Sequence, residues 1–254
     1  MKLNTLLLAS ASVLLLAACS ESAGTPDSQA AAAPAETTET TPAETPAETP
    51  ADTETVSIEV PSATYALDPT HAFLTATVEH MGLSHYTIDF TDFDASIDFN
   101  ADEPASSQIN VTISPVVDVN YPADYKAGHA DSPYASWQEA LSQDPRFIGG
   151  SEYSEITFVS TGAERTGPST GTVTGDLTFL GVTRPVTLDV TYINGKESMW
   201  EPGKHVIGFD ASGTILRSDF GQTSLQGMIS DEVAVGFSGE FGQVMAEGES
   251  SPEE

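Results

Sequence analysis

Three histidines near one another, His71, His80 and His85, form the densest group of side chains that could bind a metal or exchange protons. His71 and His80 are nine residues apart, and an odd separation places two residues on opposite faces of an unbroken strand. A zinc site needs three or four ligands with supporting hydrogen bonds, which this spacing does not provide. The chain also contains no Gly-x-Ser-x-Gly, His-Glu-x-x-His or phosphate-loop motif. We therefore expect neither a metal site nor an enzyme.

The single cysteine, Cys19, follows an N-terminal leader. Met1-Lys2 is positively charged, Leu3–Leu16 is apolar, and two alanines precede the cysteine. Residues 1–18 are too short to span a membrane as a helix and are predicted to be a signal peptide. The pattern resembles the bacterial lipobox, whose cysteine receives a diacylglyceryl group. Because Ser20 replaces the aspartate that retains enteric lipoproteins in the inner membrane, we expect a lipoprotein on the periplasmic or cell-surface side, anchored in the outer membrane. The alternative is an ordinary signal peptide that contains a cysteine.

The composition divides the rest of the chain into a linker, one large domain and a tail. Residues 19–61 are rich in Ala, Thr, Pro and Glu, with almost no large apolar side chain, and are predicted to be a disordered linker. Aromatic and β-branched residues return in residues 62–246, a length that suits one domain with its own core. Residues 247–254 form an acidic tail.

The chain is strongly acidic, with 38 acidic and 8 basic side chains and a formal net charge of -30. Residues 62–246 hold 25 of the acidic and 7 of the basic side chains, so the domain itself is negative. Nucleic acid is excluded as a natural partner because its recognition needs a basic surface. Direct adhesion to anionic lipid headgroups is disfavoured for the same reason, and we expect contact with the membrane through the lipidated N-terminus.

Apolar and polar residues alternate with a period of two through the domain, which indicates antiparallel strands with one buried face. The clearest runs are Leu74–His80, Tyr86–Phe90 and Ile109–Ile113, and further strands are expected over residues 155–161, 170–179, 184–193, 205–216 and 232–241. Asn194-Gly195 is predicted to be a hairpin tip, and residues 136–143 a short helix. About eight strands and one short helix predict an all-β fold, either a closed barrel or a sandwich.

Six segments in order resemble the YceI-like family of polyisoprenoid-binding proteins of bacterial periplasms. They are Tyr65–His71, His80–Ser84, Phe90–Phe93, Gly175–Val186, Leu216–Gly221 and Ile229–Val233. The resemblance implies an extended, lipocalin-like antiparallel β-barrel that encloses a long apolar tunnel. It also implies that the tunnel holds a long-chain apolar small molecule, such as an isoprenoid, a quinone or a lipid, with no cofactor besides this ligand.

We expect the ligand contacts to come from these segments and from strand faces that point inward. The candidates are His71, Leu74, Ala76, Val78, His80, Phe90, Phe93, Arg184, Arg217 and Phe220. The two histidines are expected to form hydrogen bonds at the tunnel mouth. Arg184 and Arg217 could meet a polar headgroup or pair with a carboxylate, and for Arg217 a structural pair with Asp219 on the same strand face is favoured. Such an acidic domain offers little positive charge for a diphosphate, so a quinone or neutral lipid is favoured.

Residues 115–150 depart from the family pattern and contain Tyr121, Tyr125, Tyr134 and Trp137. Because loops over a barrel mouth commonly control access, we expect this segment to influence which ligand enters. Two alternatives to a binding protein stay open. The inward side chains could fill the barrel completely, leaving an interaction or stress-response module without a ligand. The protein could instead be an enzyme acting on a bound lipid, with His71 or His80 essential.

Overall fold

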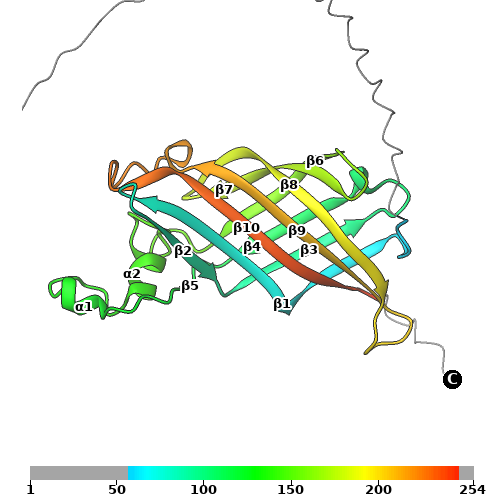
Figure 1. Cartoon of the computed structure of the whole chain (residues 1–254), viewed down its shortest axis with the longest axis horizontal. Coiled ribbons are helices and arrows are strands. Elements are labelled where there is room, and N and C mark those ends of the chain that lie inside the picture. The colour runs from blue at the N-terminus through cyan, green and yellow to red at the C-terminus, as the bar shows by residue number, and fades with distance from the viewer. Residues whose placement is uncertain (1–56, 246–254) are drawn as a thin grey trace, which may run out of the picture. The chain divides into compact units, whose positions relative to one another are not determined.

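The structure is a computed structural model that describes residues 57–245. Within them, antiparallel strands form one sheet in the order β10-β9-β8-β7-β6-β4-β3-β1-β2-β5, and pairing of β10 with β1 closes it into a barrel (Figure 1). The predicted all-β barrel is confirmed, and the sandwich alternative is excluded. The predicted signal peptide, Cys19, nearly all of the linker and the acidic tail lie outside the described residues.

The barrel strands differ widely in length. They are β1 (Ala63–His80), β2 (Ser84–Phe90), β3 (Phe93–Phe99), β4 (Gln108–Ile113), β5 (Val117–Asp118), β6 (Ile156–Arg165), β7 (Thr170–Phe179), β8 (Val182–Glu197), β9 (His205–Leu216) and β10 (Ile229–Gln243). The connections contain the short α-helices α1 (Tyr125–Gly128) and α2 (Trp137–Gln143), and the 3-10 turns η1 (Pro104–Ser106) and η2 (Arg217–Phe220).

The longest strand, β1, runs beside two shorter strands in succession. Its first part pairs with β3 and its second part with β2, so these two strands together act as one neighbour of β1. On its other side β1 pairs with β10, and this ladder is interrupted by a bulge between Leu67 and Ala72. Residues 68–71 therefore stand outside the ladder.

The barrel has two ends of different construction (Figure 1). One end, which we call the α2 end, carries the β1–β2 turn, η2 and the segment with α1 and α2. The other, the hairpin end, carries η1 and the β6–β7 and β8–β9 hairpins. Residues 57–62, which lead into β1, also lie at the hairpin end.

Two clusters of buried apolar side chains form the core. The cluster nearer the hairpin end contains Val60, Tyr65, Leu67, Ala95, Ile97, Phe99, Ile207 and Phe241. The cluster at the α2 end contains Ile113, Ile156, Phe179 and Phe220. Val60, which composition assigned to the linker, is only 4% exposed, so packing of the domain begins before residue 62.

Several predicted elements match the structure closely. The strands expected at 170–179 and 205–216 have the bounds of β7 and β9. The predicted helix is α2, whose N-cap Ser136 accepts a hydrogen bond from the Glu139 amide at 3.1 Å. The Glu139 carboxylate accepts one in return from the Ala135 amide at 2.6 Å, and such reciprocal bonds satisfy free donors at a helix start.

The predicted hairpin tip at Asn194-Gly195 is wrong. Both residues lie inside β8, and the chain turns later, between Glu197 and His205. A Cβ on Gly195 would lie 2.7 Å from Val60 Cγ1 and 3.2 Å from Ile207 Cγ2. The glycine is therefore needed for the close packing of the incoming chain against β8, and not for a turn.

Candidate functional site

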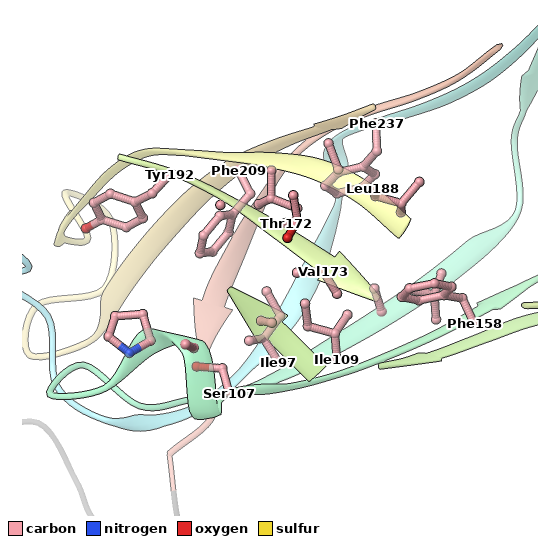
Figure 2. Close-up of a pocket in the computed structure, with 18 of the residues that line it drawn as sticks. Ile97, Ser107, Ile109, Phe158, Thr172, Val173, Leu188, Tyr192, Phe209 and Phe237 are labelled. Atoms are coloured by element: carbon pink, nitrogen blue, oxygen red, sulfur yellow. The ribbon is translucent and has the colours of Figure 1, made fainter. Parts of the chain in front are cut away.

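A cavity of about 460 Å³ lies inside the barrel and is walled by members of both core clusters. Successive residues of a strand point to opposite faces, so each strand contributes alternate side chains to the wall. Figure 2 shows such residues from strands around the barrel, among them Ile97, Ile109, Phe158, Val173, Leu188, Phe209 and Phe237. The volume falls in the range of ~300–1,000 Å³ that is usual for ligand pockets.

Aromatic rings shape much of this wall. Phe209 packs with its ring steeply inclined to those of Phe99, Tyr192 and Phe241, with centroid distances of 6.2, 5.5 and 6.3 Å. Edge-to-face pairs of this kind favour one fixed arrangement of the rings. The wall is therefore a preformed apolar surface.

The cavity reaches the surface at the hairpin end. There its lining includes the exposed residues Asp102, Glu103 and Ala105 of the η1 loop and Glu164, Arg165, Pro168 and Thr170 of the β6–β7 hairpin. Ile58 lines it on the side of the incoming chain. We call this opening the mouth.

The polar groups of the lining gather at the mouth. The carboxylates are those of Asp102, Glu103 and Glu164, and the guanidinium is that of Arg165. Arg165 Nε donates to the carbonyl of Gly167 at 2.8 Å, and its Nη2 donates to the carbonyl of Pro168. The rim is therefore negative overall, and its single cation is partly used to hold the hairpin.

Two tyrosines lie in this part of the barrel, and of these Tyr192 lines the cavity whereas Tyr65 belongs to the core cluster beside it. Burial raises the pKa of Tyr65 to about 12, and burial likewise raises the pKa of Tyr192, which lines the cavity. The Tyr65 hydroxyl donates to the Pro61 carbonyl at 2.9 Å. Both phenols therefore stay protonated at neutral pH, and the Tyr192 hydroxyl can donate a hydrogen bond near the mouth.

The α2 end of the barrel is closed by packed side chains. Phe179 and Phe220 meet at a centroid distance of 5.7 Å, and Ile148 packs on the same cluster. The Gln222 side-chain amide donates to the carbonyl of Phe147, which links the loop after η2 to the segment that contains α2.

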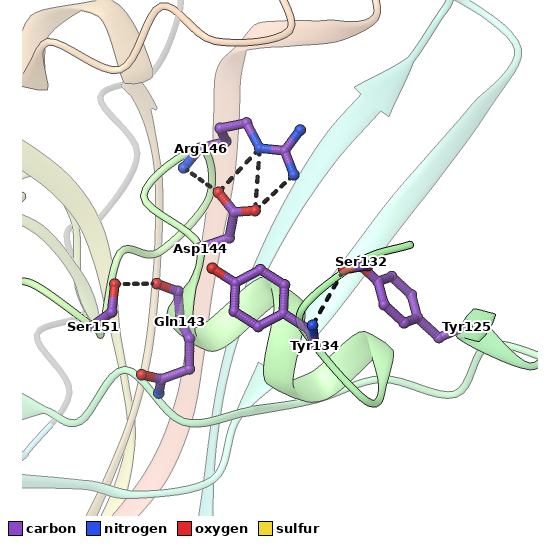
Figure 3. A network of polar contacts seen from close by, with 7 residues as sticks. All are labelled: Tyr125, Ser132, Tyr134, Gln143, Asp144, Arg146 and Ser151. Atoms are coloured by element: carbon purple, nitrogen blue, oxygen red, sulfur yellow. Dashed lines mark hydrogen bonds and ion pairs between the residues drawn. The ribbon is translucent and has the colours of Figure 1, made fainter. Parts of the chain in front are cut away.

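The segment 115–150, which contains α1 and α2, lies at this closed end and not at the mouth, where a loop that controls ligand entry would be expected. Figure 3 shows its internal network, in which Arg146 donates to Asp144 through Nε at 3.0 Å and Nη2 at 2.7 Å. The bond from Arg146 lowers the pKa of Asp144. The same segment holds an aromatic cluster, in which the Trp137 ring centroid lies 5.2 Å from that of Tyr121 and 4.9 Å from that of Tyr125. These contacts give the segment a small core of its own.

Of the ten predicted ligand contacts, Leu74 and Phe93 line the cavity. Phe90 and Phe220 belong instead to the packing that closes the α2 end. Ala76 and Val78 follow Leu74 on the same face of β1 but are not part of the cavity lining.

The two histidines do not lie at the mouth, contrary to our expectation. His71 is in the bulge of β1, exposed, with its Nδ1 2.8 Å from the Asp68 carboxylate. His80 is at the α2 end of β1 and stacks on Tyr86 at a centroid distance of 4.8 Å. In residues 57–245, no group of three or more histidine, cysteine, aspartate or glutamate side chains is arranged to hold a metal ion.

The two arginines also lie away from the cavity lining. Arg184 is exposed, and its Nε donates to the backbone carbonyl of Asp219 at 3.1 Å. Arg217 is buried and donates to Gln222 Oε1 at 2.7 Å and to the carbonyl of Ser230 at 2.8 Å. The favoured pair of Arg217 with Asp219 is wrong because β9 ends at Leu216, and both residues lie in the η2 turn, where strand alternation does not hold.

Sequence reasoning missed most of the wall. The missed residues include Ile97, Ile109, Val111, Phe158, Val173, Leu188, Tyr192, Phe209 and Phe237. The signal was present for some of them, because the alternation at Ile109–Ile113 placed Ile109 and Val111 on the buried face. It did not show that this face surrounds an open volume.

Comparison with known proteins identifies the family. Residues 65–241 match the YceI-like domain. The chain belongs to the YceI-like family. A UPF0312 protein of Enterobacter sp. is 33% identical over 174 residues, which cover 68% of this chain and 82% of that protein. Protein YceI of Escherichia coli is 33% identical over 175 residues, with 68% and 83% covered.

Solved structures agree with the barrel. The YCEI protein of Campylobacter jejuni has a TM-score of 0.50 at 26% identity, covering 66% of this chain and 90% of that one. BcnA of Burkholderia cenocepacia has a TM-score of 0.52 at 21% identity, covering 70% and 99%, which shows the shared fold. None of the helices in residues 57–245 is long and apolar enough to cross a membrane.

Proposed function

We propose that this YceI-like protein is a lipid-anchored periplasmic binding protein that holds one long apolar amphiphile inside its barrel. The observation that carries the proposal is the apolar cavity that is closed at the α2 end and reaches the surface at the mouth. A molecule with a hydrocarbon tail and a small polar head fits this plan, with the tail inside and the head at the rim. An isoprenoid quinone, a polyprenyl chain or a fatty-chain lipid has this form.

The apolar wall provides the affinity for the tail. Each methylene removed from water contributes ~0.8 kcal/mol, so several of them bind without any hydrogen bond. The alternative of a solid barrel is disfavoured because about 460 Å³ of the interior is unfilled by side chains.

The charge of the rim favours a neutral head. A phosphate or diphosphate would approach Asp102, Glu103 and Glu164 with only Arg165 in opposition. Hydroxyl groups of Ser107, Thr172 and Tyr192 in the lining can instead bond a quinone carbonyl or an alcohol. We therefore favour a quinone or a neutral lipid over a phosphorylated isoprenoid.

Membrane attachment through Cys19 completes the proposal. The leader and the residues around Cys19 fit lipidation, and anchoring in the outer membrane would keep the barrel on the periplasmic or cell-surface side. The variant Cys19→Ser should release the protein from the membrane fraction into the soluble periplasm, and retention of this variant in the membrane would contradict lipid attachment at Cys19.

Binding is favoured over catalysis by the placement of the acid–base candidates. His71 and His80 are not in the cavity lining, so neither is placed to act on a molecule held there. The enzyme alternative predicts turnover that depends on these histidines, and our proposal predicts that His71→Gln and His80→Gln leave ligand binding unchanged.

A cavity-filling variant tests the proposal directly. Ala95 is buried on β3 and lines the cavity, whereas Ala234 is on β10 and exposed. Ala95→Phe should displace about three methylenes of tail and weaken binding of decylubiquinone by ~2 kcal/mol, about thirtyfold. Ala234→Phe should leave the affinity unchanged. Equal affinity of both variants, measured by calorimetric titration, would place the ligand outside the cavity.

A further inference from the structure

The hairpin between β8 and β9 ends in an unusually apolar turn. We call residues Ser198–Lys204 the β8–β9 tip. Its Trp200 is 86% exposed, more than any other large apolar side chain in residues 57–245, and the adjacent Met199 is 74% exposed. Two neighbouring large apolar side chains in water are costly unless something covers them.

The β8–β9 tip is also well ordered by its own polar contacts. The Ser198 hydroxyl accepts hydrogen bonds from the amides of Trp200 and Glu201, both at 3.2 Å. The Glu197 carboxylate accepts one from the Gly203 amide at 2.8 Å, and Ser198 N donates to Lys204 O at 2.8 Å. A turn in which most backbone amides already have hydrogen-bond acceptors can enter an apolar environment at a lower desolvation cost.

Charge distinguishes the β8–β9 tip from the rest of the barrel. Its only ionised side chains, Glu201 and Lys204, form an ion pair at 2.5 Å. The surrounding domain has 25 acidic and 7 basic side chains between residues 62 and 246. The tip is therefore a locally neutral site on a negative body.

The β8–β9 tip lies at the same end of the barrel as the mouth. Tyr192 of β8 and Phe209 of β9, which line the cavity, stand on the two strands that lead to the tip (Figure 1, Figure 2). Ile58, near the start of the described residues, also lines the cavity at this end.

We propose that the β8–β9 tip docks the mouth of the barrel on the surface of a lipid bilayer, with Trp200 and Met199 in the interface. Tryptophan prefers this region because its ring is apolar and its N–H finds a partner among the headgroups. The negative domain selects zwitterionic or neutral headgroups over anionic ones. The inference rests on the proposed function in one respect: if the barrel binds an apolar ligand, docking brings the mouth to the bilayer that contains this ligand.

The opposite end of the barrel offers a competing surface. Met81, Leu83 and Met228 are 56%, 82% and 49% exposed, and the Met81 amide donates to the Met228 carbonyl at 2.8 Å. These residues stand at the closed α2 end, where docking would turn the mouth away from the membrane. They supply a matched control of similar apolar exposure.

Tryptophan fluorescence gives the first test. All strands of the closed barrel lie within residues 63–243, so the chain from Ser20 onward keeps the whole barrel and lacks the acylation site. The chain has two tryptophans, and Trp137→Phe leaves Trp200 as the only reporter, while Trp200→Phe leaves Trp137. With phosphatidylcholine vesicles, Trp200 should shift to the blue and be quenched by brominated acyl chains, and Trp137 should do neither. Absence of quenching of Trp200, both in Trp137→Phe and in the unmodified chain, would overturn the proposal.

Vesicle flotation gives the second test. The double variant Met199→Ser/Trp200→Ser should bind phosphatidylcholine vesicles roughly tenfold more weakly or worse. The control variant Met81→Ser/Leu83→Ser should bind as the unmodified chain does. A loss confined to the control variant would show docking through the α2 end and contradict the proposal.

Ligand transfer separates this inference from the proposed function. Binding of decylubiquinone added from solution should be the same in Met199→Ser/Trp200→Ser and in the unmodified chain, whereas uptake from preloaded vesicles should be slower in the variant. Equal uptake rates would overturn the docking inference. Failure of every variant to bind decylubiquinone would instead contradict the proposed function, and the vesicle quenching of Trp200 would still decide whether the tip docks.

Discussion

Arg217 is a buried cation that holds together the loop between β9 and β10. Its guanidinium donates to Gln222 Oε1 and to the backbone carbonyls of Ser224, Ile229 and Ser230, at 2.7 to 3.3 Å. Burial lowers the pKa of Arg217, but an arginine stays charged at any physiological pH. Its side chain therefore acts as a multiple hydrogen-bond donor to neutral acceptors, and the nearby Asp231 carboxylate interacts with it through charge.

Replacing this residue should destabilise the barrel strongly. Arg217→Met would leave four acceptors without their donor, at a cost of about 3 kcal/mol or more in the free energy of unfolding. Arg184→Met, an exposed control, should change it by less than ~0.5 kcal/mol. Urea unfolding followed by circular dichroism measures both, and equal stability of the two variants would contradict the structural role of Arg217.

The Asp68–His71 pair should show a coupled pH dependence. The Thr70 hydroxyl first, and His71 next, lower the pKa of Asp68 to about 2, and the hydrogen bond with Asp68 raises the pKa of His71. The Asp68 contribution to stability is thus present above its unfolded pKa of ~3.9 and is lost as the pH falls toward 2. The His71 contribution is present below ~6.5 and is lost as the pH rises through the raised pKa.

Both side chains are exposed to solvent, so NMR titration is a better measure of this pair than unfolding. The Asp68→Asn variant should lower the pKa of His71 toward ~6.5. A His71 titration curve that is identical in Asp68→Asn and in the unmodified protein would show that the pair does not form in solution.

Among the elements, β8 depends on one glycine for its contact with the incoming chain. A Cβ on Gly195 would overlap Val60 Cγ1 and the Tyr192 hydroxyl and would be tight against Ile207. A Cβ on Gly208, which faces Asn194 across the β8–β9 ladder, would meet atoms only at 3.7 Å or more. Val60 can therefore pack closely against β8 because the residue at position 195 has no side chain.

Substituting the two glycines should separate this packing from a general effect of glycine. Gly195→Ala should lower the free energy of unfolding by roughly 1–3 kcal/mol because Val60 must move, and Gly208→Ala should change it little. Thermal denaturation of both variants provides the comparison. Equal losses of stability in the two variants would show that replacing a glycine in these strands is destabilising in general, and would contradict a specific role for the contact with Val60.

Sequence reasoning reached the elements more readily than the site. Alternation located β7 and β9 because each has one face against the interior along its whole length. It failed at Asn194-Gly195, where a local turn signal is overridden by contacts with Val60. It also failed to locate the mouth, because which end stays open depends on Phe179, Phe220 and Ile148 meeting from distant parts of the chain.

At the scale of the whole molecule, the dominant electrostatic feature is the acidic surplus of the barrel domain, which has 25 acidic and 7 basic side chains in residues 62–246. Like charges on a compact body repel, and this repulsion disfavours the folded state. The three ion pairs described in residues 57–245 are partly exposed, and one involves a histidine, so they offset little of this repulsion.

Salt should therefore stabilise the barrel. Raising sodium chloride from ~0.01 M to ~0.15 M shortens the screening length from ~30 Å to ~8 Å, so Tm should rise over this range. Differential scanning calorimetry gives the answer, and a Tm that falls or stays constant would mean that favourable ion pairs outweigh the surplus of negative charge.

The central claim is that the barrel encloses a long apolar molecule in its cavity. Native mass spectrometry of the chain from Ser20 onward, expressed in a periplasm, followed by organic extraction, tests it most directly. Our account predicts a stoichiometric adduct that is released as a quinone or a neutral long-chain lipid, and that is diminished in Ala95→Phe. An empty protein that also fails to bind quinones and fatty-chain lipids in titration would contradict the account, and an adduct retained in full by Ala95→Phe would contradict the location of the ligand.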